Sequence, residues 1–324
     1  MRPSGAGPGD ANTRATCVNC RNFRLPCGDG PALFCYEWTD SRPKAIVQIV
    51  HGAFEHAGRY AHFARALGAR GFAVVAEDHR GHGRTAATAD ELGHMGPPNA
   101  IERVADDVAR LTLQSRAAFP GLPAILFGHS LGSLISQRVL AKHGRLYDAT
   151  VLSGSLSMED LIQTQPSIDA ATSRHGRDTP AEQLHAAFLT ELVRDIESPR
   201  TRFDWLSRDC GEVDKYICDP LCGFPLTHGA WQDVAEAATL TLDARELRRI
   251  PGNLRVLIVS GEADPVHGKG VAIDQLYRAC VAAGLFHVSK RLYPGGRHEM
   301  LNELNRDAFI QDTIQWMEDA LASV

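Results

Sequence analysis

The chain has 324 residues, of which 44% are hydrophobic and 23% charged, and its 34 basic and 39 acidic side chains give a formal net charge of −5. A chain of this length can bury a large core, and its composition is that of a globular protein rather than of a disordered or fibrous one. The small acidic surplus argues against a nucleic-acid partner, and no apolar run is long enough to span a membrane.

Residues 1–20 are predicted to form a disordered tail, because the start of the chain is rich in Gly, Pro, Ala and Ser and lacks the apolar run of a secretory signal. Cys17 and Cys20 form a single CxxC near its end. Without a second pair, a CxxC is weak evidence for a zinc site, so metal or redox use is the lesser alternative to free, reduced thiols. Reduced cysteines favour the cytoplasm.

Short apolar runs then alternate with amphipathic stretches along the chain. The predicted strands comprise residues 45–50, 72–76, 123–127, 149–152, 254–260 and 287–293. The predicted helices comprise residues 60–70, 100–118, 131–142, 271–283 and 307–322. This alternation predicts an α/β core, formed by residues 21–154 and 248–324, in which helices flank a mostly parallel sheet.

Residues 155–247 interrupt the alternation with helical patterns, aromatic residues and no convincing strand. An aromatic helical insertion between two core strands is predicted to form a cap over the carboxyl edge of the sheet. The alternative is a surface excursion that packs a small core of its own.

Residues 128–132 read Gly-His-Ser-Leu-Gly, a GxSxG motif placed between a predicted strand and a predicted helix. Such a strand-to-helix turn presents its serine at the edge of the sheet, and the flanking glycines remove side chains that would collide. Ser130 is therefore the candidate nucleophile. A helix-capping serine in a glycine turn is the alternative.

A serine hydroxyl needs a base and a carboxylate that orients the base, and this architecture orders them serine, carboxylate, histidine along the chain. Asp264 follows the strand at residues 254–260, and Glu262 remains the alternative carboxylate. His298 follows the last strand on a glycine-rich loop and is the candidate base.

The oxyanion of an acyl-transfer intermediate needs two backbone donors. The amide of Leu131, directly after the nucleophile, is one candidate, and that of Ala53, in the loop after the first predicted strand, is the other. His51, in the same loop, is interpreted as a neutral imidazole that braces it.

Three blocks carry a resemblance to a known family: residues 51–60 (HGAFEHAGRY), 78–84 (DHRGHGR) and 128–132 (GHSLG). They resemble the α/β-hydrolase fold, and within it the monoacylglycerol lipase and lysophospholipase-like branch that is also called serine aminopeptidase S33. The resemblance implies Ser130, Asp264 and His298 as a triad, Ala53 and Leu131 as oxyanion donors, and a mobile cap. Phe54 stands where these lipases usually have glycine, which narrows the pocket expected beside the oxyanion loop, and Thr85 replaces the usual serine.

The leading hypothesis is a serine carboxylic-ester hydrolase that works through an acyl-enzyme on monoacylglycerol-like or other small, single-chain apolar esters. No metal or organic cofactor is expected. The residues expected to contact the substrate are Phe54, His129, Trp205 and Phe224. A transient contact of the cap with lipid surfaces stays open, as does the oligomeric state.

Two alternatives remain. An aminopeptidase or amidase would need cap carboxylates to hold a free amino group, and the available ones are Glu159, Asp160, Asp204 and Asp209. A non-catalytic scaffold that binds small molecules would keep the pocket without the activity. Dehalogenases and epoxide hydrolases are disfavoured, because they use aspartate where this chain has Ser130.

Overall fold

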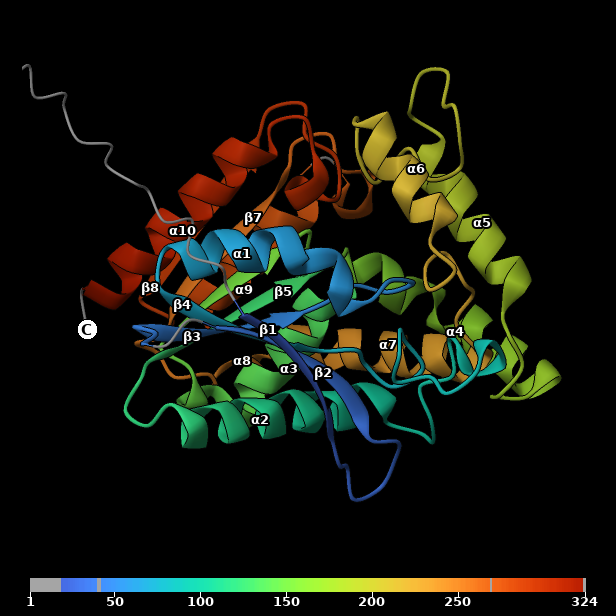
Figure 1. The fold of residues 1–324 in the computed structure, drawn as a ribbon. Helices are drawn as coiled ribbons and strands as arrows, with labels where there is room; N and C mark the ends of the chain where they lie inside the picture. Colours follow the sequence, from blue (N-terminus) through green and yellow to red (C-terminus); the bar gives the residue numbers. More distant parts are fainter. Residues whose placement is uncertain (1–18, 40–41, 269, 323–324) are drawn as a thin grey trace, which may run out of the picture.

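The computed structural model describes residues 19–39, 42–268 and 270–322. One eight-stranded sheet runs through its centre in the order β1-β2-β4-β3-β5-β6-β7-β8. Each pairing from β4 through β8 is parallel, whereas β2 is antiparallel to both of its neighbours. The predicted mostly parallel sheet with flanking helices is therefore confirmed (Figure 1).

The strands are β1 (Asn19–Leu25), β2 (Leu33–Thr39), β3 (Ala45–Val50), β4 (Phe72–Glu77), β5 (Ala124–His129), β6 (Ala149–Ser153), β7 (Arg255–Gly261) and β8 (His287–Tyr293). The helices are α1 (Ala61–Ala69), α2 (Ala100–Ala118), α3 (Leu131–His143), α4 (Met158–His175), α5 (Glu182–Val193), α6 (Cys210–Cys218), α7 (His228–Leu242), α8 (Ala244–Leu247), α9 (Val271–Ala282) and α10 (Arg306–Ala322).

The start of the chain differs from the prediction. Asn19 and Cys20, which the prediction placed in a disordered tail, begin β1, and residues 1–18 lie outside the described residues. Cys20 is a free thiol, and Cys17 belongs to the part that is not described.

The central strands are apolar because both faces of the sheet are covered. Every residue of β3, β4, β5 and β6 is buried, as expected for parallel strands between two layers of helices. Side chains of α1 and α10 pack on one face, and those of α2, α3 and α9 on the other (Figure 1). Parallel strands end at a shared edge, so the loops after β3, β5, β7 and β8 meet there.

Five helices, α4 to α8, lie between β6 and β7 in the sequence. Of these, α4, α5 and α6 lie together at one end of the molecule (Figure 1). They divide into two groups by packing. Buried side chains of α4 and α7 join the main core, whereas apolar residues between 189 and 216 form a separate small core. The predicted insertion at 155–247 is thus partly continuous with the α/β core. Among the described helices, none is both long and apolar enough to cross a membrane.

Candidate active site

Ser130 lies on the turn between β5 and α3 with φ 56° and ψ −120°, a conformation that L-residues rarely adopt. Both neighbouring glycines are needed for close packing: an ideal Cβ on Gly128 would lie 2.4 Å from the carbonyl oxygen of Gly132. One on Gly132 would lie 2.0 Å from the carbonyl oxygen of Val50. The Ser130 amide donates to the Ser153 carbonyl at 2.9 Å, which ties the turn to β6.

Asp264 follows β7 and is completely buried. Its Oδ2 accepts a hydrogen bond from Ser260 Oγ at 2.8 Å, and its Oδ1 accepts one from the Val266 amide at 2.9 Å. The same Oδ2 lies 2.9 Å from Nδ1 of His298. Glu262, the alternative carboxylate, is exposed to solvent. The structure therefore brings Asp264, and not Glu262, to the candidate base.

The Asp264–His298 pair fixes the protonation of the imidazole. Burial alone would lower the pKa of His298, but the carboxylate outweighs burial and raises that pKa. Burial alone would raise the pKa of Asp264, but His298 outweighs it and holds the pKa well below its ordinary value. Because Nδ1 faces a carboxylate, Nδ1 carries the proton and the neutral ring has its lone pair on Nε2. Nε2 is buried and has no hydrogen-bond partner within the described ranges, so it is available to accept a proton.

Ser130 and His298 line one cavity of about 1320 Å³. The His298 ring lies against Gly154, where an ideal Cβ would be 3.1 Å from its Cε1. Gly154 directly follows Ser153, whose carbonyl holds the Ser130 amide. The end of β6 is therefore the common support of the hydroxyl and the imidazole.

Ala53 and Leu131 line the same cavity as Ser130. Leu131 is the first residue of α3, and the first amides of a helix have no partner within it. The loop after β3 passes close to Ser130 at Gly52, where an ideal Cβ would lie 3.2 Å from Cβ of Ser130. The loop after β3 and the start of α3 thus flank the same hydroxyl.

A buried ion cluster that the sequence analysis did not identify joins these loops. Arg59 donates to Glu55 at 2.5 Å and binds Glu299 through two hydrogen bonds of 2.6 and 2.7 Å. Glu55 accepts from the Gly52 amide and from the Tyr60 hydroxyl, both at 2.7 Å. Since Glu299 directly follows His298, the cluster connects the loop after β3 to the loop after β8. The HGAFEHAGRY block contained two of its members, but the sequence did not show that they pair with Glu299.

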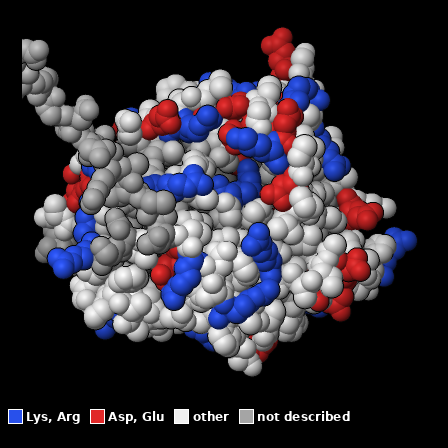
Figure 2. All heavy atoms as spheres, viewed as in Figure 1, with Lys and Arg blue, Asp and Glu red and all other residues white. Residues whose placement is uncertain are grey.

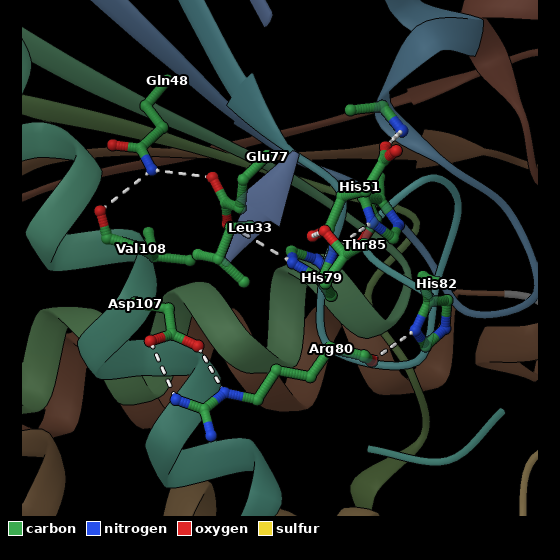
Figure 3. A network of polar contacts seen from close by, with 12 residues as sticks. Leu33, Gln48, His51, Glu77, His79, Arg80, His82, Thr85, Asp107 and Val108 are labelled. Atoms are coloured by element: carbon green, nitrogen blue, oxygen red, sulfur yellow. Dashed lines mark hydrogen bonds and ion pairs between the residues drawn. The ribbon is translucent and has the colours of Figure 1, made fainter. Parts of the chain in front are cut away.

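A second network of polar contacts, shown in Figure 3, connects the loop after β3 to the end of β4 and the loop that follows it. His51 accepts a hydrogen bond at Nε2 from the His79 amide, so its Nδ1 carries the proton and donates to the Gly52 carbonyl. Burial lowers the pKa of His51 well below its ordinary value, which keeps the ring neutral. His79 stacks on it at 3.8 Å and approaches Glu77 at 3.3 Å. His51 therefore braces the loop as a neutral imidazole.

The residues expected to contact substrate fall into two groups. Phe54, His129 and Trp205 line the cavity. The Trp205 ring lies 5.0 Å from that of His298, and burial lowers the pKa of His129 to about 3, so His129 is neutral. Phe224 is not among the described lining residues; it packs against Phe54 and His82 instead. Contact of Phe224 with the substrate stays a prediction.

Of the four cap carboxylates considered for an amino-group site, only Asp160 lines the cavity. Asp204 accepts from Arg200 and Thr201, and Asp209 caps α6. Three further acidic residues line the cavity and are exposed to solvent: Glu191, Asp195 and Glu262. The cavity thus has charged groups at its solvent side, whereas its wall is largely apolar.

Comparisons with known proteins agree with this architecture. The family model described as serine aminopeptidase, S33, matches residues 41–305. A monoacylglycerol lipase of Mycolicibacterium smegmatis is 30% identical over 296 residues, or 90% of this chain and 94% of that protein. The monoglyceride lipase of Mus musculus is 29% identical over 289 residues, or 86% of each. A solved carboxyl esterase from Bacillus coagulans has a TM-score of 0.85 at 26% identity and covers 94% of this chain and 99% of its own.

Proposed function

Because the chain belongs to the serine aminopeptidase S33 family and has the α/β-hydrolase fold, we propose that it hydrolyses carboxylic esters with Ser130, His298 and Asp264 as its catalytic triad. The observation that carries the proposal is the 2.9 Å contact between Asp264 and His298, whose unpartnered Nε2 belongs to the cavity that holds Ser130. The relatives act on esters, as their names state, and this supports the same reaction class here.

The reaction begins when Ser130 Oγ attacks the ester carbonyl while its proton passes to Nε2 of His298. Asp264 holds the imidazole in the tautomer that this step requires and stabilises the imidazolium that results. The amides of Ala53 and Leu131 are the proposed donors to the oxyanion, and each such donor contributes about 3–4 kcal/mol in comparable sites. His298 then protonates the departing alcohol, and water hydrolyses the acyl-enzyme by the same steps in reverse.

The cavity supports a single-chain apolar ester, of the monoacylglycerol type, as substrate. Apolar side chains of residues 155–247 form much of the cavity wall: Leu156, Leu161, Ile168, Leu184, Phe188, Leu192, Leu226, Trp231 and Val234. Such a wall favours an acyl chain. The exposed acidic residues at the solvent side leave room for a polar alcohol. In this proposal residues 155–247 act as a cap that shields the acyl chain from water.

An amidase acting on free amino termini receives less support. It would need cap carboxylates to hold the amino group, and of the four considered only Asp160 lines the cavity, where it is exposed to solvent.

The test is the hydrolysis of a p-nitrophenyl ester by the parent protein and by Ser130→Ala. We expect the variant to lose at least about 10³-fold in kcat, whereas Ser173→Ala, an exposed serine on α4, keeps the parent rate. A fluorophosphonate should label one serine per chain, and Ser130→Ala should abolish the label. Equal rates of ester hydrolysis by the parent and Ser130→Ala would refute the proposal. Faster hydrolysis of an amino-acid anilide than of an acyl ester would favour the amidase.

A further inference from the structure

Three metal-binding side chains meet on the outer side of the loop after β3. They are His56 of that loop and Asp219 and Cys222 of the connection between α6 and α7. One donor atom from each, a ring nitrogen, a carboxylate oxygen and the thiol sulfur, lies within 4.8 Å of the other two. None of the three belongs to the proposed triad or to the oxyanion donors.

The donor set is that of a borderline transition metal. Zn²⁺ takes tetrahedral sets of imidazole, thiolate and carboxylate at about 2.0–2.3 Å, which places donors roughly 3–4 Å apart. His56 Nε2 and Asp219 Oδ2 are 2.9 Å apart and share a hydrogen bond, which an ion bound between them would replace.

The backbone orients two of the donors in advance. The Cys222 amide donates to the Asp219 carbonyl at 3.0 Å and closes a turn with Asp-x-x-Cys spacing. The Leu221 amide donates to Asp219 Oδ1 at 2.9 Å, which leaves Oδ2 turned towards His56. Cysteine ligands of structural zinc sites are paired on similar two-residue spacings.

The three donors are partly open to solvent and lie among charges of both signs. Arg59 is shared between Glu55 and Glu299, so this buried cluster carries one net negative charge, and Asp219 adds another. The side chains of His56 and Asp219 are 12% and 30% exposed, and Asp219 borders a hollow of about 340 Å³ whose lining also includes Arg59, Arg65, Lys215 and Arg306. Cysteine binds a metal ion as the thiolate, so ion binding would release the thiol proton and strengthen as pH rises.

We propose that His56, Asp219 and Cys222 form a binding site for Zn²⁺ or a similar divalent transition-metal ion, with water as the fourth ligand. The site would join the loop after β3 to the α6–α7 connection. The two segments already touch next to it, because the Gly223 amide donates to the Phe54 carbonyl at 2.9 Å. The ion would therefore fasten the cap to the loop that carries Ala53.

The test uses the full chain with Cys17 and Cys20 replaced by serine, since that CxxC can itself bind metal. Co²⁺ serves as the spectroscopic probe, and we expect a near-ultraviolet thiolate-to-cobalt band that saturates at one ion per chain and is removed by Zn²⁺. Cys222→Ser should abolish the band, whereas Cys218→Ser, an exposed cysteine at the end of α6, should keep it. Asp219→Asn should weaken Co²⁺ binding by about tenfold or more.

A second measurement does not depend on the sulfur band. Zn²⁺ should raise the Tm of the parent, because a ligand that binds only the folded state stabilises it, and it should not raise the Tm of Cys222→Ser. Circular dichroism in the presence of a chelator verifies that the variants fold. The absence of a band, or a band that persists in Cys222→Ser, would overturn the proposal.

Discussion

Ser130 and Phe54, two non-glycine residues beside the cavity, hold positive φ angles of 56° and 59°. Such angles persist only where the surroundings determine them, and they concentrate at functional sites. For Phe54 the surroundings are visible: its carbonyl accepts from the Gly223 amide at 2.9 Å and from the Tyr216 hydroxyl at 3.0 Å. Contacts with the insertion at residues 155–247 thus hold the strained loop that carries Ala53.

The strain at Phe54 can be separated from the packing of its ring. The ring is buried, and its centroid lies 4.7 to 6.5 Å from those of four aromatic rings in residues 155–247. Phe54→Ala should therefore cost about 3–5 kcal/mol of unfolding free energy. Phe54→Gly loses the same ring, but glycine removes the strain that a residue with a Cβ has at this positive φ, which is about 1 kcal/mol. We therefore expect Phe54→Gly to be the more stable variant, by about 1 kcal/mol in urea unfolding.

Phe188 on α5 provides the matched control, because it contacts Phe54 from a regular helix. There the order should reverse, with Phe188→Gly less stable than Phe188→Ala by about 1 kcal/mol. The same order at both positions would show that no strain is stored at Phe54.

The sequence allowed the proximity of Asp264 and His298 to be predicted, because each follows a parallel strand and such strands end at one edge. It did not identify the Glu55–Arg59–Glu299 cluster, since charges far apart in sequence carry no mark of their pairing. The packing of Phe224 against Phe54 and His82 was not predicted either. Aromatic residues in an insertion predict a core, but they do not indicate which of them face a cavity.

At the scale of elements, sequence analysis predicted all six strands of the parallel part of the sheet, β3 to β8, and every residue of β3 to β6 is buried. β1 and β2 were missed because the prediction rested on strands that alternate with helices, and no helix lies between these two antiparallel strands.

Glu299 links two of these elements, and its ionisation should appear in the stability of the protein. Burial alone would raise the pKa of Glu299, but Arg59 outweighs it and lowers that pKa from 4.5 to about 2. A carboxylate with a lowered folded pKa stabilises the fold above its unfolded pKa, and this stabilisation is lost as pH falls. We expect the unfolding free energy to decrease between about pH 4.5 and pH 2, by at most about 3 kcal/mol from this group.

Urea unfolding across this pH range measures the effect. Glu299→Gln should be less stable than the parent at pH 7, and the gap should close as pH approaches 2. Glu182→Gln, an exposed residue at the start of α5, should leave the curve unchanged. A gap independent of pH would mean that the Glu299 charge does not couple to folding.

At the scale of the whole molecule, the insertion and the core are joined at the site itself. The His298 amide donates to the Trp205 carbonyl at 3.4 Å, and the Glu299 amide donates to the Leu206 carbonyl at 2.8 Å. Basic and acidic side chains are dispersed over the face seen in Figure 2, in keeping with the small net charge. The large apolar volume therefore lies inside, between insertion and sheet, where an acyl chain would be held away from water.

This placement predicts how the rate depends on acyl length. Each methylene buried in the cavity contributes up to about 0.8 kcal/mol, so kcat/KM for p-nitrophenyl esters should rise by at most about fourfold per methylene until the cavity is filled. Leu161→Trp places a larger ring on the wall formed by α4, and it should lower kcat/KM for long acyl chains while leaving the acetyl ester unchanged. Leu113→Trp, at an exposed position of α2, should change neither. Equal losses for acetyl and long-chain esters in Leu161→Trp would show that the acyl chain does not follow this wall.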